Sequence, residues 1–170
     1  HKIRKIVIDN GTVTTLAGSS AGFADNATGT SAKFNKPEGI TTDGTNLYVA
    51  DYLNNRIRKI VISTGVVTTL AGSSSGYTDH NTGTSANFDN PIEITTDGTN
   101  LYVVDYGNDR IRKIVIDNGT VTTLAGTGSE GSTDHATGTS ASFNRPQGIT
   151  TDGTNLYVSD TRNMKIRKIE

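Results

Sequence analysis

The chain has 170 residues, of which 32% are hydrophobic and 19% are charged, values typical of one globular domain with a modest core. Its 16 basic and 17 acidic side chains nearly cancel, so we expect neither nucleic acid nor an anionic membrane as a partner. The chain has no cysteine and no apolar run of membrane-spanning length, which excludes disulfides, thiolate metal sites and a spanning helix.

The first segment predicts a two-stranded hairpin. The stretches "IRKIVI" at 3–8 and "VTTLAG" at 13–18 are rich in β-branched residues. They flank Asn10-Gly11, a pair that forms tight hairpin turns because both residues readily take positive φ. The chain starts at His1 without an initiator Met, so we expect either a processed product or a piece excised from a longer chain.

Four further strands are predicted after a long loop rich in glycine and serine. Each is a short run of Val, Ile, Thr and Tyr, and Asp43-Gly44 marks the turn between the first two. No stretch shows a 3.6-residue apolar period, which argues against α-helices. The predicted antiparallel meander has its strands at residues 39–43, 46–51, 56–62 and 66–72.

This unit recurs along the chain with a nearly constant step. "TTDGTNLYV" occurs three times, and steps of 54, 54 and 55 residues separate Ile3, Ile57, Ile111 and Ile166. A repeat of this length built from four strands is typical of one blade of a β-propeller, whose stacked blades cover each other's faces. We therefore expect an all-β fold of four-stranded antiparallel blades in one domain, residues 1–170. Its units are about 2–55, 56–109 and 110–164, with a partial strand at 165–170.

The order of motifs within each unit resembles a known repeat. "PEGITTDGTNLYVA" is followed by "DYLNNRIRKI", and the next unit carries "DYGNDRIRKI". These are similar to the Asp-x-x-Asn-x-Arg-Ile signature of the NHL-repeat β-propeller family, in its long bacterial type. The resemblance covers essentially the whole chain and implies a propeller of six blades as the commonest count. The departures are local: Glu93 and Thr161 replace a glycine and a tyrosine, and the long loop exceeds the usual family length.

Three blades are too few for a closed ring, because propellers contain about four to eight blades. An open array would expose apolar blade faces larger than a monomer usually tolerates. We therefore predict a homodimer that closes six blades, whereas a trimer would give an unusual nine. The stretches "KIRKI" at 2–6 and 165–169 are copies of one strand, so each junction of a closed dimer would hold a surplus copy. A longer natural array cut at these points is the alternative.

The topology of a meander sorts its turns into two ends. The short "DGTN" turns lie at one end, whereas "DYLNNR" and the long interblade loop share the other end, the loop face. Binding residues collect on the long loops of rigid repeat scaffolds, so we expect ligand contacts there. The candidate residues are Asp25, Asn54, Asp79, His80, Asn108, Asp109, Asp134 and His135.

A second polar group recurs at the same place in the units and is interpreted as structural. Asp51, Asp105 and Asp160 each end a strand before a tight turn, where a carboxylate can accept backbone N–H groups. We expect each to pair with the arginine that follows, Arg56 or Arg110 in the first two units. A phenylalanine near the end of each long loop is expected to anchor the loop between blades; these are Phe34, Phe88 and Phe143.

Metal sites find little support in the sequence. His80 and His135 lie in glycine-rich loops, but no His-x-x-x-His pair suits zinc, and the loops lack the acidic ladder of a calcium-binding loop. Asn26 takes the corresponding position in the first unit. We expect no cofactor, with calcium as an alternative if Asp25, Asp79 and Asp134 converge on a central channel.

Twelve of the 16 basic residues lie in the four repeated segments "KIRK" or "RIRK". The resemblance implies RNA binding as an alternative, since some NHL propellers bind RNA. These residues alternate with isoleucine within a strand, where their stems cover the sheet, and no aromatic platform for bases lies nearby. We therefore expect no nucleic-acid binding.

The leading functional hypothesis is a non-enzymatic binding or scaffold module that meets a protein or a glycan on the loop face. No Ser-His-Asp arrangement is present. The resemblance also implies a metal-dependent lyase as an alternative, but that site needs more histidines than the two interior ones here. A third hypothesis is an excised or engineered fragment that self-assembles without a ligand. The resemblance favours an extracellular or periplasmic location.

Overall fold

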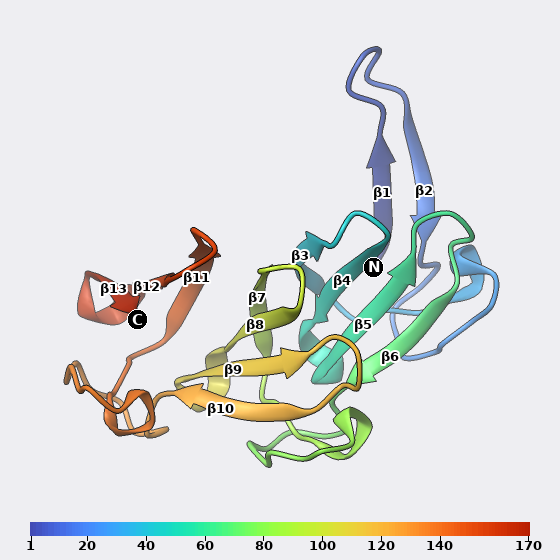
Figure 1. The fold of residues 1–170 in the computed structure, drawn as a ribbon. Coiled ribbons are helices and arrows are strands. Elements are labelled where there is room, and N and C mark those ends of the chain that lie inside the picture. The colour runs from blue at the N-terminus through green and yellow to red at the C-terminus, as the bar shows by residue number, and fades with distance from the viewer.

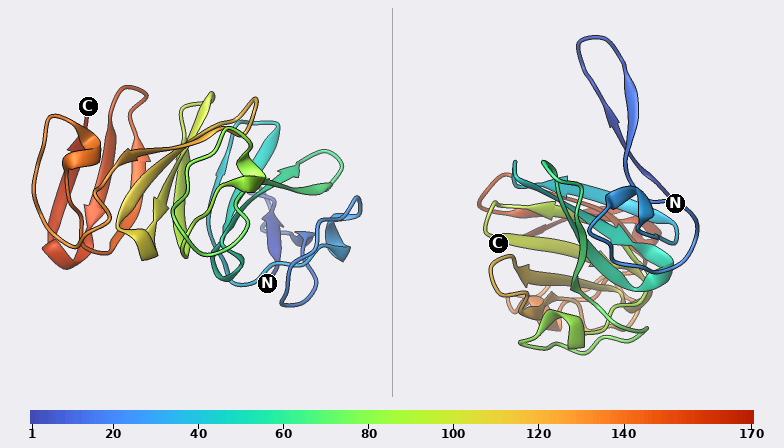
Figure 2. Two further views of the ribbon diagram at one scale, coloured as in Figure 1. Left: turned by 90° about the horizontal axis from the view of Figure 1, so that it is seen from below. Right: turned by 90° about the vertical axis from the view of Figure 1, so that its right-hand side faces the viewer.

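The computed structural model describes residues 1–170 and consists of antiparallel sheets joined by turns and long loops (Figure 1). The sheets stand side by side in a row, with the N-terminal hairpin at one end and the C-terminal sheet at the other (Figure 2). The all-β fold of four-stranded blades predicted from the sequence is confirmed, whereas closure into a ring by a second copy stays a prediction.

Two blades are complete and two are partial. The first complete blade has strands β3 (Pro37–Thr42), β4 (Asn46–Asp51), β5 (Arg56–Val61) and β6 (Val67–Ala71). The second has β7 (Pro91–Thr96), β8 (Asn100–Asp105), β9 (Arg110–Val115) and β10 (Val121–Ala125). The third blade has only three strands, β11 (Pro146–Thr151), β12 (Leu156–Asp160) and β13 (Lys165–Ile169). The N-terminal hairpin pairs β1 (Ile3–Ile6) with β2 (Val13–Ala17).

Short 3-10 helices of three residues interrupt the loops. One of them follows the second strand of each blade; these are η2 (Tyr52–Asn54), η4 (Tyr106–Asn108) and η6 (Thr161–Asn163). The others lie in the long loops, η1 (Gly29–Ser31), η3 (Gly83–Ser85) and η5 (Gly138–Ser140). None of these helices has the length or the apolar character needed to cross a membrane.

The repeated phrase "TTDGTNLYV" is one hydrogen-bonded unit joining the first two strands of a blade. The Asp43 carboxylate accepts the backbone N–H groups of Thr45 at 2.8 Å and Asn46 at 2.6 Å, and also the Tyr48 hydroxyl at 2.7 Å. The same contacts recur at the two later turns, around Asp97 and Asp152. The phrase therefore forms the end of one strand, the turn and the start of the next strand, which explains its recurrence.

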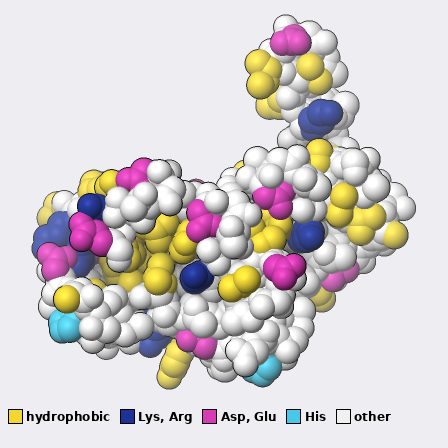
Figure 3. Space-filling model, in the orientation of Figure 1, with side chains coloured by type: hydrophobic (Ala, Val, Ile, Leu, Met, Phe, Trp, Pro, Cys, Tyr) yellow, Lys and Arg dark blue, Asp and Glu magenta, His cyan; other side chains and the backbone are white.

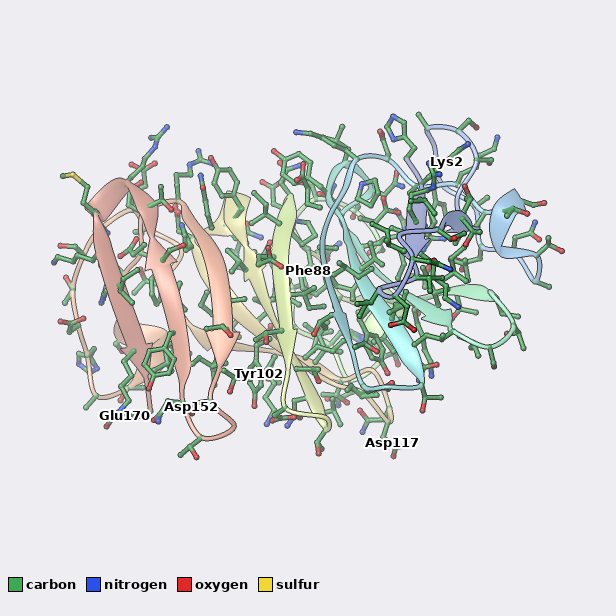
Figure 4. All side chains as sticks on the ribbon, turned by 90° about the horizontal axis from the view of Figure 1, so that it is seen from above. Lys2, Phe88, Tyr102, Asp117, Asp152 and Glu170 are labelled. Carbon is green, nitrogen blue, oxygen red and sulfur yellow. The ribbon has the colours of Figure 1, made fainter.

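The core lies between the blades rather than within them. Phe88 is fully buried in a cluster that joins Ile57 of the first blade to Leu101 of the second. Phe143 does the same between the second and third blades, beside Ile111. Figure 4 shows Phe88 in the interior, while Asp117 and Asp152 lie in turns at one edge of the molecule. The phenylalanines of the long loops are thus part of the packing that holds neighbouring blades together.

The sequence had led us to expect the long loops at one end of the blades. In the structure they extend beyond that end. The loop before the first complete blade runs along its outer strand, where Asn26 and Val67 exchange two backbone hydrogen bonds of 3.1 and 2.9 Å. His80 and Val121 make the same exchange on the second blade. An outer strand has unpaired N–H and C=O groups, and the loop satisfies them. The middle of each long loop therefore lies on the outer rim.

Candidate functional site

Each blade contains a buried arginine held between two carboxylates. Arg58 is fully buried; its guanidinium donates to Asp51 at 2.8 Å and to Asp25 at 2.6 Å. It also donates to the backbone carbonyls of Lys33 and Ala24 in the long loop. The arginine therefore ties β5, the end of β4 and the long loop into one cluster.

The cluster recurs in the other two blades with corresponding residues. Arg112 bridges Asp105 and Asp79, and Arg167 bridges Asp160 and Asp134. The partner of each strand-end aspartate is thus the arginine at the third position of the "RIRK" or "KIRK" segment. In the first two units the sequence had suggested the first position instead. Burial decides the choice, because only the arginine at the third position lies inside the sheet packing.

The strand-end aspartates are fully buried and hydrogen-bonded on several sides. Asp105 accepts the backbone N–H of Asp89 at 2.7 Å, the Asn108 amide at 2.8 Å and Arg112 at 2.8 Å. Burial raises the pKa of Asp105 to about 6, although the Arg112 charge and these hydrogen bonds act in the opposite direction. With every oxygen occupied in this way, Asp105 has no free face to offer a substrate.

Several residues expected on the loop face serve the fold instead. The Asn54 and Asn108 amides each donate to a strand-end aspartate and to a loop carbonyl, at 2.6 to 2.8 Å. Asp109 accepts the backbone N–H of Arg145 at 2.7 Å, across the junction with the third blade. These three side chains fix the loops and the junctions between blades.

The two loop histidines act as turn caps. His80 Nδ1 accepts the backbone N–H of Thr82 at 2.9 Å, and His135 accepts that of Thr137 at 2.9 Å. Asn26 Oδ1 accepts the N–H of Thr28 at 2.8 Å in the first unit. An asparagine oxygen and a histidine Nδ1 therefore do the same work here, which explains why the two residue types exchange at this position.

The rim carboxylates stay on separate blades and do not form a ring. Asp25, Asp79 and Asp134 are each bound to their own buried arginine. Asp25 and Asp79 also accept the backbone N–H of a threonine on the outer strand, at 3.0 and 2.8 Å. No group of three or more His, Asp or Glu side chains is close enough to share a metal ion.

An open groove of about 470 Å³ lies on the rim of the second blade. Tyr77 is 61% exposed and the Arg110 guanidinium stacks 4.3 Å from the centre of its ring. The groove is lined by these two residues together with Thr78, Asp79, Thr123, Gly126, Thr127 and Thr139. It therefore combines an exposed aromatic face, a carboxylate, a guanidinium and several hydroxyl groups.

Tyr77 was not among the residues expected on the loop face. The signal available was an aromatic residue two positions before the rim aspartate, present as Phe23 in the first unit and Tyr77 in the second. Arg56 stacks on Phe23 at 4.0 Å, as Arg110 does on Tyr77. The third unit has Ser132 at this position, so the aromatic platform is limited to two units.

A second hollow, of about 410 Å³, lies where the first strands of the three blades approach each other. Glu38, Glu93 and Gln147 line it with Gly39 and Gly148. A Cβ at Gly39 would lie 2.6 Å from the Glu93 carboxylate, so the glycine gives this side chain its space. The departure of Glu93 from the glycine of the other units thus adds a carboxylate to the hollow.

Known proteins are similar to this chain, and one of them is named for its NHL repeats. NHL repeat-containing protein 2 of Homo sapiens is 30% identical over 98% of this chain, which spans 25% of that protein. Protein SUPPRESSOR OF QUENCHING 1, chloroplastic, of Arabidopsis thaliana is 30% identical over 82% of this chain, which spans 14% of its length. No family model matches the chain.

Solved structures show the same fold. A crystal structure of an auxiliary nutrient binding protein from Bacteroides thetaiotaomicron superposes with a TM-score of 0.74 at 21% sequence identity. The match covers 99% of this chain and 42% of that one. The chain therefore spans a quarter or less of the length of these sequence relatives, and less than half of this structural neighbour.

Proposed function

We propose, from the premise that this chain belongs to the NHL-repeat family, that it is a non-enzymatic module binding a glycan or a protein surface on the rim of its blades. The observation that carries the proposal is the groove around Tyr77, Asp79 and Arg110. An aromatic face can cover the apolar side of a sugar ring, while carboxylate, guanidinium and hydroxyl groups hydrogen-bond its edges. The Bacteroides thetaiotaomicron neighbour is an auxiliary nutrient binding protein, which agrees with a binding role.

Binding to the groove is tested by screening immobilised glycans and then titrating the best one by calorimetry. We expect Tyr77→Ala to weaken binding about tenfold, because an aromatic contact is worth about 0.5–1.5 kcal/mol beyond the area it buries, and about 1.4 kcal/mol corresponds to a tenfold change in affinity. Tyr106→Ala is the matched control, since Tyr106 also lies beside an arginine but does not line the groove. Equal loss in both variants, or binding that Tyr77→Ala leaves unchanged, would contradict this assignment.

We propose no catalytic role for the buried polar residues. Asp51, Asp105 and Asp160 are occupied by an arginine, an asparagine and a backbone N–H. A lyase-type metal site would need several histidines around one ion, and the two loop histidines cap turns on separate blades. Turnover, in the presence of added zinc, of a peptide α-hydroxyglycine, the substrate that the family resemblance implies for the lyase alternative, would overturn this view.

Self-association is a second candidate role, favoured by the two ends of the blade row. Ile166 on the last blade is 75% exposed, whereas its equivalents Ile57 and Ile111 are fully buried. At the other end Ile40 is 46% exposed, whereas its equivalent Ile94 is 3% exposed. We propose that two copies stack end to end into a six-bladed ring. Light scattering at micromolar concentration should give twice the mass of one chain, and a stable monomer would refute the ring.

A further inference from the structure

We propose that the rim carries a second binding platform and that the two platforms together bind an extended polysaccharide with uronic acid carboxylates. The Phe23 platform is Phe23 with Arg56, and the Tyr77 platform is Tyr77 with Arg110. The inference rests on the proposed glycan binding at the Tyr77 groove. It adds the chemical class of the ligand and the length over which the rim holds it.

The two platforms have the same construction on the two complete blades. Phe23 is 46% exposed and Tyr77 is 61% exposed, and each ring has the guanidinium of its arginine within 4.3 Å of its centre. A glycine after the fourth strand lies against each arginine: a Cβ at Gly72 would collide with Arg56, and one at Gly126 with Arg110. The surface that we propose for sugar binding on the second blade thus has a counterpart on the first.

The arginines of the platforms differ in charge pairing from those inside the blades. Arg58 and Arg112 each form two ion pairs, whereas neither Arg56 nor Arg110 forms one. Each platform arginine donates to a single backbone carbonyl, at 2.7 Å. A guanidinium has five N–H donors in a planar fork that fits a carboxylate with two parallel hydrogen bonds. Both platforms therefore offer an unpaired cation that suits a carboxylate ligand.

The carboxylates beside the platforms are already engaged. Asp25 is paired with Arg58 and Asp79 with Arg112, both at 2.6 Å, which reduces their repulsion of an anionic ligand. Basic and acidic side chains are interspersed over the face drawn in Figure 3, without a large patch of one sign. Recognition of an anion therefore depends on individual arginines, which suits a ligand whose charges are spaced along a chain.

The surroundings of the Tyr77 platform fit a sugar better than an acidic peptide. Peptides commonly bind by pairing with a free strand edge or by placing side chains in apolar pockets. The loop already pairs with the outer strand edge at His80 and Val121, and Tyr77 is the only hydrophobic residue that lines the groove. An exposed aromatic ring among threonine hydroxyls matches the apolar face and the hydroxyl edge of a sugar.

The position of the platforms on neighbouring blades sets the length of the ligand. Packed sheets lie about 10 Å apart face to face, so a single sugar ring that stacks on one aromatic residue does not reach the other. A chain of several sugars can contact both. Because the second contact is then intramolecular, a long oligomer should bind at least about tenfold more tightly than a disaccharide of the same composition.

The test titrates the whole chain with three uronate polymers by calorimetry: polygalacturonate, alginate and hyaluronan. Each polymer is compared with its carboxyl-reduced form, in which hydroxymethyl groups replace the carboxylates, and with its own disaccharide. We expect at least one polymer to bind. Its reduced form should bind at least about tenfold more weakly, because charge-assisted hydrogen bonds to the arginines are lost.

Substitutions at the platforms assign the binding to them. Arg56→Gln and Arg110→Gln should each weaken binding of the polymer about tenfold, and Phe23→Ala should remove the advantage of the polymer over the disaccharide. Arg162→Gln is the matched control, because Arg162 is an exposed arginine of η6 that forms no ion pair and does not line the groove. Circular dichroism checks that every variant is folded.

The outcomes separate this inference from the proposed function. Equal affinity for a polymer and its reduced form, with the dependence on Tyr77 retained, overturns the uronate class but leaves glycan binding at the groove. Binding that Tyr77→Ala weakens and Phe23→Ala does not overturns the second platform. Tighter binding of poly-glutamate, lost in both arginine variants, overturns the polysaccharide in favour of an acidic protein. If none of the three polymers binds, the inference fails, and if neutral glycans also fail to bind, the proposed glycan role fails with it.

Discussion

The buried arginine of each blade is the residue on which the rim loops depend. Arg58 and Arg112 are fully buried and each reaches two carboxylates and two loop carbonyls. The ring of Phe34 or Phe88 lies about 5 Å below the guanidinium, so the same residue links polar rim to apolar core. A planar fork with several donors suits these contacts, and a lysine ammonium does not.

Arg112→Lys should therefore destabilise the fold strongly. Loss of one partner from a buried ion pair costs about 3–5 kcal/mol, because the carboxylate that remains is buried and poorly compensated. Arg110→Lys is the control, since this arginine lies on the open groove and bonds a carbonyl at the surface. Urea unfolding followed by circular dichroism measures both; a cost below about 1 kcal/mol for Arg112→Lys would contradict the role given to the cluster.

The turn aspartates should make the free energy of unfolding fall at low pH. Burial alone would raise the pKa of Asp97, but hydrogen bonds from Asn100, Tyr102 and Thr99 outweigh it and lower the pKa to about 2. A folded pKa below the unfolded value of 3.8 contributes stability that is present above about pH 4 and lost as pH falls toward 2. Hydrogen bonds likewise lower the pKa of Asp152. Burial would raise the pKa of Asp43, but its hydrogen bonds outweigh this effect and lower the pKa.

Asp97→Asn removes one of the carboxylates whose protonation lowers the stability at low pH. The variant should be less stable than the wild type at pH 5, and the difference should shrink by pH 2.5, where the wild-type carboxylate begins to be protonated. Urea unfolding at the two pH values measures it, with Asp117→Asn as a control because Asp117 is an exposed aspartate in a different turn. A difference that is constant with pH would refute the assignment.

At the scale of the element, the long loop behaves as an edge cover of the blade. It pairs with the fourth strand at Asn26 or His80 and then passes close to the turn between the third and fourth strands. Gly83 marks the tightest point: a Cβ there would collide with the carbonyl oxygens of Leu70 and Gly119. Because both obstacles are backbone atoms, neither can rotate away.

Gly83→Ala should therefore lift the loop from the second blade and cost about 1–3 kcal/mol, as other overpacked sites do. Thr84→Ala is the matched control, because Thr84 is the exposed neighbour in the same short helix. The backbone N–H of His80 donates to the carbonyl of Val121, and that of Val121 donates to the carbonyl of His80. Hydrogen exchange of these two amides therefore measures whether the loop has left the strand. Unchanged protection at both amides in Gly83→Ala would show that the loop tolerates the added methyl group.

The sequence located the strands to within a few residues because their turns have distinctive chemistry. Asp43-Gly44 and the tyrosine of "NLYV" mark one turn by themselves, and the repeat step then places every copy. The path of the long loop was missed, since glycine-rich segments have no periodicity and their backbone pairing with a strand edge leaves no side-chain pattern. The partner of Asp51 was misplaced for a related reason: two arginines share the segment, and only burial distinguishes them.

At the scale of the molecule, the two ends of the row are the least satisfied surfaces. The last blade exposes Ile166 and its open edge, and the first complete blade exposes Ile40 beside a half-formed hairpin. These are the surfaces that blades elsewhere in the chain bury against each other. A ring of two copies would bury both kinds of surface without any new type of contact.

Ile166→Asp tests this arrangement. The residue is 75% exposed in the single chain, so the charge costs a monomer little, whereas in a ring it would be buried against a neighbouring blade without a partner. We expect light scattering to give dimers for the wild type and monomers for Ile166→Asp. Met164→Asp is the control on the same blade, because Met164 is 92% exposed in the turn before β13, away from the apolar clusters between blades. If Ile166→Asp stays dimeric, the stacked face is not the one that joins the copies, and the ring must be abandoned in favour of another contact.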